Sequence, residues 1–279
     1  MDFRFVEFPP PAALAPVLRR SFFARGRIPY RADRIMPNGL AVAVFNLGRP
    51  HRVGKSETPE RNPRFRHSWL HGVQTTPIFN LPEGETHVLG LLFEPLGFHA
   101  RFGTDMRGLA DRTVDAREVL PADVIGAVER GLTAPDSRAA HDAVHRALMA
   151  APTANVRPWL RSLYGGIKTT DGTLRLDRVY DATGCSARHV GARFKRAVGV
   201  TPKVLCRIYR LQALLEAIDP ATAVNWTGLA HQFGFYDQAH FNREFRRFAG
   251  LTPRQYLAWR RRDLPDLGKG ESVHFAPQR

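Results

Sequence analysis

One segment of the chain, GFYDQAHFNREFRRFAGLTPRQY at residues 234–256, concentrates side chains that bind anions and base edges. Its arginines carry a permanent positive charge and a planar pair of donors that matches guanine, and its glutamine can pair with adenine. The same segment holds three phenylalanines, which need an apolar neighbour. The residue types therefore predict an element that packs on one side and offers a cationic surface to a polyanion on the other.

A helix over this segment would separate the two kinds of side chain. At about 100° per residue, Phe241, Phe245 and Phe248 fall on one apolar stripe that must pack on a neighbour. Asp237 is placed to cap the start of the helix, and Gly250 can take the left-handed conformation that ends it. The opposite face carries Ala239, His240, Arg243, Arg246 and Arg247.

The same pattern occurs a second time, 51 residues earlier. FKRAVGVTPK at 194–203 aligns with FRRFAGLTPR at 245–254, which indicates two copies of one supersecondary unit. In the first copy Ser186 is placed to cap the helix, and Val190 and Phe194 face inward. The outward face there carries Arg188, His189, Ala192, Lys195 and Arg196.

A short helix and a glycine turn precede each basic helix, in LDRVYDATG at 176–184 and in WTGLAHQFG at 226–234. Helix, turn and second helix make a helix-turn-helix, whose second helix enters the major groove of DNA. Between the copies, VLCRIYRLQALLEAI at 204–218 predicts a connecting helix. One basic face alone would most simply be a solvated surface. Two faces on a rigid connector could instead reach successive grooves about 34 Å apart.

The segment GFYDQAHFNREFRRFAGLTPRQYL closely resembles the second helix-turn-helix of the AraC family of bacterial transcription regulators. The resemblance covers residues 155–260 and implies a DNA-binding domain of two helix-turn-helix units joined by a long helix. It also implies which residues contact bases: Arg188, Gly191 and Ala192 in the first recognition helix, and Gln238, Ala239, His240 and Arg243 in the second.

The resemblance carries expectations about function. It implies a sequence-specific transcription regulator that responds to a small-molecule effector, with activation as the commoner mode in the family. The implied partners are double-stranded DNA, RNA polymerase, the effector and a second copy of the chain in a homodimer. Relatives often carry a small β-barrel sensor with a helical dimerisation segment in front of the DNA-binding domain.

The charge is divided unequally along the chain. The net charge of +15 splits into +11 for residues 151–279 and +4 for residues 1–150. A basic half attracts polyanions through its summed field. This division supports two regions with different tasks.

The N-terminal half has the pattern of short strands. Apolar stretches at 40–47 and 87–93 lie between Pro, Gly and Asn punctuation, which predicts a small barrel or sandwich. Apolar residues three and four apart then predict helices at 122–132 and 137–150.

We therefore expect an α+β two-domain protein. Residues 1–150 would form a β-rich, barrel-like sensor or dimerisation domain with a helical segment, and residues 155–260 an all-α DNA-binding domain. Residues 261–279 are expected to be a flexible tail.

Several classes of protein are disfavoured by what the sequence lacks. It has no run of 18 apolar residues, and its N-terminus has acid and prolines where a secretion signal is apolar, which predicts a cytoplasmic, nucleoid-associated protein with no membrane partner. Cys185 and Cys206 have no CxxC spacing, so a cysteine zinc site is not expected. Without GxGxxG, GxxxxGK[ST] or GxSxG, we expect no enzyme, no catalytic residues and no cofactor.

Two alternatives remain open at this stage. A cupin-like, metal-dependent enzyme or sensor in the N-terminal half would need histidines to converge with an acidic residue, from among His51, His67, His71, His87, Glu83 and Glu85. A sequence-tolerant architectural protein would use the basic charge alone, because phosphate contacts give nonspecific affinity.

Overall fold

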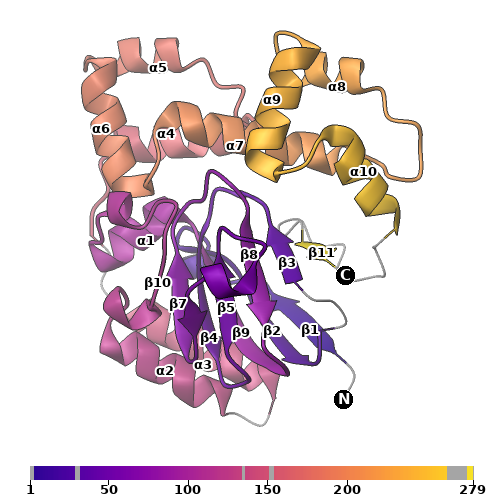
Figure 1. The fold of residues 1–279 in the computed structure, drawn as a ribbon. Coiled ribbons are helices and arrows are strands. Elements are labelled where there is room, and N and C mark those ends of the chain that lie inside the picture. The colour runs from indigo at the N-terminus through magenta and orange to yellow at the C-terminus, as the bar shows by residue number, and fades with distance from the viewer. Residues whose placement is uncertain (1–2, 29–31, 134–135, 151–153, 263–274, 279) are drawn as a thin grey trace.

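The computed structural model describes residues 3–28, 32–133, 136–150, 154–262 and 275–278 (Figure 1). The strands of its N-terminal part lie in two antiparallel sheets, one of which also includes a strand from the C-terminal end of the chain. The order in the six-stranded sheet is β1 (Arg4–Phe8), β2 (Leu18–Gly26), β9 (Thr86–Phe93), β4 (Ala41–Asn46), β7 (Ser68–His71), β10 (Thr113–Val114). The order in the five-stranded sheet is β11 (Phe275–Gln278), β3 (Ala32–Ile35), β8 (Ile78–Pro82), β5 (His51–Gly54), β6 (Arg64–Phe65).

The N-terminal part also contains three α-helices among the described residues, namely α1 (Pro95–Phe102), α2 (Ala122–Leu132) and α3 (Ser137–Ala150). The last two begin and end where the sequence predicts helices. Four short 3-10 helices are η1 (Ala12–Leu14), η2 (Pro59–Arg61), η3 (Met106–Gly108) and η4 (Ala116–Glu118).

The strands lie in two sheets that are not closed into a single barrel in the part of the chain that the structure describes. The predicted strand-rich N-terminal domain is confirmed, but its two sheets, as far as the structure describes them, do not join into the barrel-like arrangement that the sequence predicts. Two of the sheet edges are formed by β6 and β10, which are each only two residues long, so pairing ends there.

Strand β4 lies inside the six-stranded sheet, and all six of its residues are buried. Side chains alternate between the faces of a strand. Ala43 and Phe45 therefore join the core formed with α2 and α3, while Val42 and Val44 join the core between the sheets. A strand covered on both faces has a continuous apolar sequence, as LAVAVFNL does.

The C-terminal part is helical. Its elements are α4 (Pro158–Thr169), α5 (Leu176–Thr183), α6 (Ala187–Val198), α7 (Pro202–Glu216), α8 (Trp226–Gln232), α9 (Gln238–Ala249) and α10 (Pro253–Arg262). The pairs α5–α6 and α8–α9 are the two predicted helix-turn-helix units, and α7 is the predicted connecting helix (Figure 1).

The sequence predicts a flexible tail over residues 261–279, and the structure differs from this at both ends of the segment. Residues 261–262 are the last of α10, and residues 275–278 pair with β3 as strand β11. An extended backbone supplies the donors and acceptors that an edge strand leaves unpaired, and this pairing needs no particular side chain pattern. Residues 263–274 and 279 lie outside the described residues.

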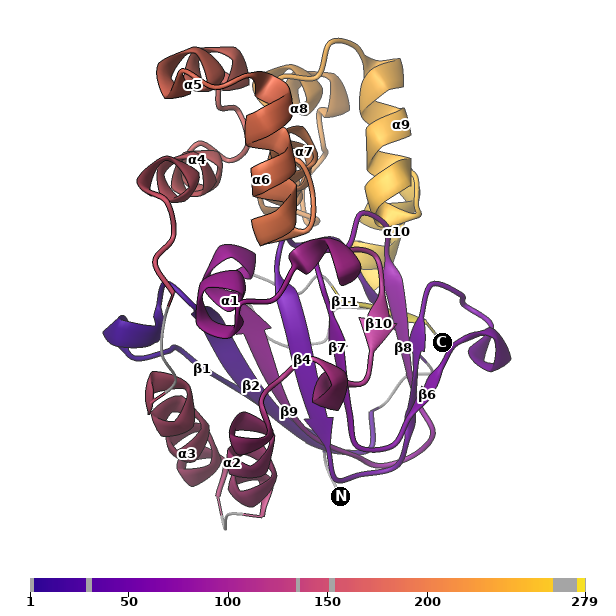
Figure 2. The ribbon, with the colours of Figure 1, turned by 90° about the vertical axis from the view of Figure 1, so that its left-hand side faces the viewer.

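The helical domain and the sheets share one hydrophobic core. Met36, Val73, Leu96 and Ala100 from the N-terminal part pack in the same cluster as the buried residues of the helical domain. Helix α6 also lies against α1 and η3, and Figure 2 shows α1 beneath it. The two parts are therefore fixed to each other by packing as well as by the chain that links them.

A buried histidine in this fold makes a testable contribution to pH dependence. His71 is 3% exposed, and burial lowers the pKa of its imidazole to about 4. The unfolded chain binds a proton on this ring near pH 6.5, whereas the folded chain does so only near pH 4. We therefore expect the ring to lower the free energy of unfolding by about 3 kcal/mol as the pH falls from 6.5 to 4.

Urea unfolding of wild type and His71→Phe at pH 6.5 and pH 4.5 would measure this effect. The carbonyl oxygen of Gly72 keeps its bond from the Gln74 amide at 3.0 Å when the His71 ring is lost. We expect a smaller loss of stability with acid in His71→Phe than in wild type, and no such difference in His67→Gln, because His67 is exposed. An identical acid loss in His71→Phe and wild type would contradict the prediction.

Candidate nucleic-acid interface

Helix α9 is held by the side chains that the sequence assigns to this task. The Asp237 carboxylate accepts a hydrogen bond from the His240 backbone N–H at 2.6 Å, which caps the helix. Phe241, Phe245 and Phe248 are each at most 1% exposed, so the predicted apolar stripe is confirmed. The helix ends at Gly250, whose φ of 68° lies in the left-handed region that glycine tolerates.

Most of the predicted contact residues of α9 lie at its surface. The exposed ones are Gln238, Ala239, Arg243, Arg246 and Arg247. His240 is only partly exposed, because its ring meets the edge of Phe235 with centroids 5.7 Å apart. At 100° from Phe241, position 240 lies at the border between the two faces, so the sequence places it further outward than the structure does.

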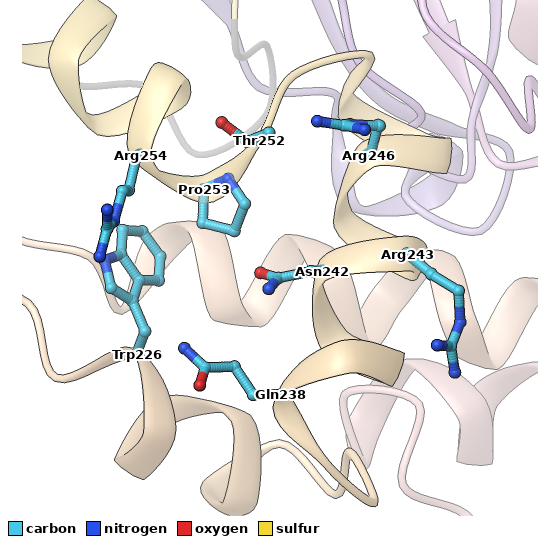
Figure 3. Close-up of a pocket in the computed structure, with 8 residues that line it drawn as sticks. All are labelled: Trp226, Gln238, Asn242, Arg243, Arg246, Thr252, Pro253 and Arg254. Carbon is cyan, nitrogen blue, oxygen red and sulfur yellow. The ribbon is translucent and has the colours of Figure 1, made fainter.

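A groove of about 410 Å³ lies between α9 and α10 (Figure 3). Figure 3 shows Arg243 turned away from the other lining residues, while Arg254 lies beside Trp226. The guanidinium groups of Arg246 and Arg254 at this groove suit it to phosphate oxygens. The lining residues are Trp226, Gln238, Asn242, Arg243, Arg246, Thr252, Pro253 and Arg254.

Five of these groove residues are absent from the site predicted from sequence, and two of the five, Asn242 and Arg254, carry an amide and a guanidinium group. Asn242 follows Gln238 by four residues and so stands above it on the same helix face, a signal that the sequence contains. Arg254 belongs to the first turn of α10, whose start is fixed by Thr252 and Gln255. The Thr252 N–H donates to the Gln255 amide oxygen at 2.8 Å, and the Gln255 N–H donates to the Thr252 hydroxyl at 3.2 Å. Only the packing of α10 on α9 brings Arg254 to the groove.

Helix α6 repeats this construction. The Ser186 hydroxyl accepts from the His189 N–H at 3.2 Å, and Val190 and Phe194 are fully buried. Gly191 is partly exposed among the predicted contact residues, and the exposed ones are Arg188, His189, Ala192, Lys195 and Arg196.

Arg196 has a partner in the N-terminal domain. Its Nε lies 3.8 Å from an Asp105 carboxylate oxygen, a distance that gives a weak ion pair at the surface. The hydrogen bond from the Arg107 side chain and further contacts with Arg107 and Arg196 lower the pKa of Asp105 to about 2. Arg196 is therefore placed at the domain boundary, whereas Arg188 lies near the free end of the helix.

The histidines of the N-terminal half do not gather into the metal site considered above. The His51 Nδ1–H donates to the Asn80 amide oxygen at 2.8 Å and the ring packs on Trp69, whereas His87 packs on the edge of Phe23. Glu83 pairs with two arginines. Over the described residues, no three His, Cys, Asp or Glu side chains are placed to hold a metal ion. Within the same residues, no helix has the length and apolar character needed to span a membrane.

Comparisons with known proteins agree with this geometry. Residues 179–259 match the family described as a helix-turn-helix domain, and residues 6–115 match a domain of unknown function (DUF6597). A search of curated proteins gave no match.

The solved structures found include ToxT from Vibrio cholerae. It is 10% identical, with a TM-score of 0.44, over 92% of this chain and 98% of that one. Wild-type ToxT from Vibrio cholerae strain SCE256 bound to an unsaturated fatty acid is 9% identical, with a TM-score of 0.41, over 92% of this chain and 94% of that one. Both likenesses are distant.

The helix-turn-helix match spans both basic helices, each of which is capped at its start and anchored by buried aromatic or aliphatic side chains. Together with the motif at residues 234–257, this match identifies residues 179–259 as a DNA-binding helix-turn-helix domain of the type found in the AraC family of transcription regulators.

Proposed function

We propose that the chain binds specific sites on double-stranded DNA by placing α6 and α9 in the major groove, and that it activates transcription in response to a small-molecule effector. The observation that carries this proposal is the division of both helices into a buried apolar stripe and an exposed basic face. Residues 155–260 would bind DNA, and residues 1–150 would bind the effector and a second copy of the chain. RNA polymerase would be a further partner. The chain itself would lie in the cytoplasm, associated with the nucleoid.

The contact residues divide into two proposed roles. Residues toward the capped ends would meet base edges, since recognition helices contact bases with their N-terminal residues. These are Arg188, Gly191 and Ala192 in α6, and Gln238, Ala239, His240 and Arg243 in α9. The flanking groups would hold phosphates. These are His189, Lys195 and Arg196 in α6, Arg246 and Arg247 in α9, and two residues of the groove, Asn242 and Arg254.

Selection of bound duplexes from random DNA by the full chain would test this proposal. We expect one enriched sequence pattern with two half-sites, and an affinity preference for it that persists at moderate salt. Binding without any sequence preference would instead support an architectural protein, because counterion release from phosphates is independent of sequence. Mapping of bound DNA in the cell would then give the regulated genes, and their products would suggest effectors to test on the full chain.

Two arginines of α9 should differ in what they contribute. We expect Arg243→Ala to cost about 1–3 kcal/mol of binding free energy on the selected duplex and to relax preference at one base position. Arg246→Ala should weaken binding to all duplexes alike and reduce the salt slope by about 1, as expected for a phosphate contact. Affinities on matched and mismatched duplexes at several salt concentrations measure both. An equal loss on both duplexes for Arg243→Ala would contradict its base-reading role.

A further inference from the structure

The C-terminal ends of both recognition helices pack against the N-terminal domain. Figure 2 shows α6 and α9 side by side above the sheets, with the turns that precede them on the side away from the sheets. The ends that would enter DNA are therefore free, while the opposite ends are seated. We call the contact surface under each C-terminal end its seat. The contacts at the two seats show what fixes the distance between α6 and α9.

Arg34 of strand β3 forms the seat of α9. Its side chain is 8% exposed, and its Nη1 lies 3.5 Å from the carbonyl oxygen of Ala249, the last residue of the helix. A cation at the C-terminus of a helix interacts favourably with the helix dipole. The guanidinium is itself fixed, because it pairs with Glu57 and lies over the Phe79 ring at 4.9 Å.

Gly250 makes this seat possible. A Cβ atom at this position would lie 2.6 Å from Arg34 Nη1 and 3.3 Å from Pro77. A side chain at this position would therefore have to displace the Arg34 guanidinium. Helix α9 is therefore in direct contact with β3 and with the loop that precedes β8.

Helix α6 has a separate seat on η3. A Cβ atom at Gly199 would lie 3.0 Å from the Met106 carbonyl oxygen and 3.4 Å from the Ala110 side chain. Met106 is fully buried, so this support belongs to the core of the N-terminal domain. One domain thus supports the ends of both helices at two fixed places.

The connecting helix is tied to the same domain between the two seats. The buried Gln212 amide of α7 donates to the Pro37 carbonyl oxygen at 2.5 Å. The Tyr209 ring of α7 would lie 3.1 Å from a Cβ atom at Gly39. Neither helix-turn-helix unit can therefore turn about α7 without breaking a contact with the N-terminal domain.

We propose that the N-terminal domain sets the distance between the two recognition helices, and that Arg34 is the residue that positions α9. The proposal rests on the DNA-binding function proposed above. Adding one base pair between two half-sites moves one of them by about 3.4 Å and turns it by about 34°. A helix seated at Arg34 cannot follow that displacement, so the full chain should require one spacing.

The spacing requirement can be measured with the full chain. Duplexes selected by wild type are remade with one base pair added or removed between the half-sites. Affinities are then compared for wild type, Arg34→Gln and Arg64→Gln. The last is a matched control, because it removes the same charge from the N-terminal domain at a surface pair with Glu83. Wild type and Arg64→Gln should bind shifted duplexes about tenfold more weakly, and Arg34→Gln less than about threefold.

The outcomes separate this proposal from the proposed function. If wild type enriches no duplex, DNA reading itself is contradicted. If Arg34→Gln keeps the spacing preference of wild type, or loses affinity equally at every spacing, only the positioning role is overturned. Should Arg34→Gln fail to fold, Gly250→Asn tests the same seat from the helix side. Asparagine tolerates the left-handed backbone, but its side chain would displace the guanidinium.

Discussion

Replacing Glu94 by alanine is expected to lower the free energy of unfolding by about 3 kcal/mol, near the lower end of the range for breaking a buried ion pair. Glu94 precedes α1 and is 3% exposed. Its carboxylate accepts from Arg19 Nε at 2.9 Å, from Lys168 Nζ at 2.6 Å and from the Tyr164 hydroxyl at 2.5 Å. Removing it leaves two cations and a buried hydroxyl without their acceptor.

The size of this effect depends on how far the cations can reach water. Arg19 and Lys168 are 38% and 26% exposed, so both can be partly resolvated after the substitution. Tyr164 cannot, because it is buried; burial, with the Tyr209 and Glu94 side chains nearby, holds its pKa well above the usual value. Loss of the carboxylate acceptor of the buried Tyr164 hydroxyl alone costs about 1–3 kcal/mol.

Urea unfolding of Glu94→Ala, Glu94→Gln and Glu83→Ala would measure this effect. Glu94→Gln should fall between wild type and Glu94→Ala, because an amide oxygen can accept from Tyr164 but cannot balance the cations. Glu83 pairs with Arg52 and Arg64 near the surface, so Glu83→Ala should cost no more than about 1 kcal/mol. Equal losses for Glu94→Ala and Glu83→Ala would show that the buried carboxylate does not hold the two domains together.

The sequence predicts those features of the helical domain that are determined by residues close together in the chain. The stripe of Phe241, Phe245 and Phe248 follows from helical periodicity, and the caps at Ser186 and Asp237 follow from local hydrogen bonding. These features recur within one or two turns of a helix, so their spacing contains the required information.

Contacts between distant segments could not be predicted in this way. Arg34 meets the end of α9 across 215 residues, and Glu94 meets Lys168 across 74. Neither Arg34 nor Glu94 stands in a sequence pattern that distinguishes it from the solvated charged residues elsewhere in the chain. The same reason explains why Arg254 was missed, since the angle between α9 and α10 decides whether it reaches the groove.

The expected arrangement of the N-terminal strands was partly right for a related reason. Apolar runs at β4 and β9 identify strands that are covered on both faces, but they contain no information about which strand is its neighbour. The pairing of β9 with both β2 and β4 and the division into two sheets are long-range properties.

The second large effect concerns the anchor of the recognition helix itself. We expect Phe245→Ala to lower the free energy of unfolding by about 3–5 kcal/mol, as for other buried aromatic side chains. The ring is fully buried and meets Phe241 and Tyr256, each with centroids 5.6 Å away, as well as Trp226 at 6.4 Å. These partners come from α8, α9 and α10, so the cavity would loosen all three helices of the second unit.

DNA binding should therefore be lost together with stability, even though Phe245 itself faces away from the proposed DNA surface. Tyr236→Ala is the matched control, since it removes an aromatic ring that is 88% exposed, two residues before α9. Urea unfolding should show little change in Tyr236→Ala. If both variants unfolded at the same urea concentration, the phenylalanine stripe could not be what fixes α9, and the division of the helix into an anchoring face and a DNA-facing one would lose its energetic basis.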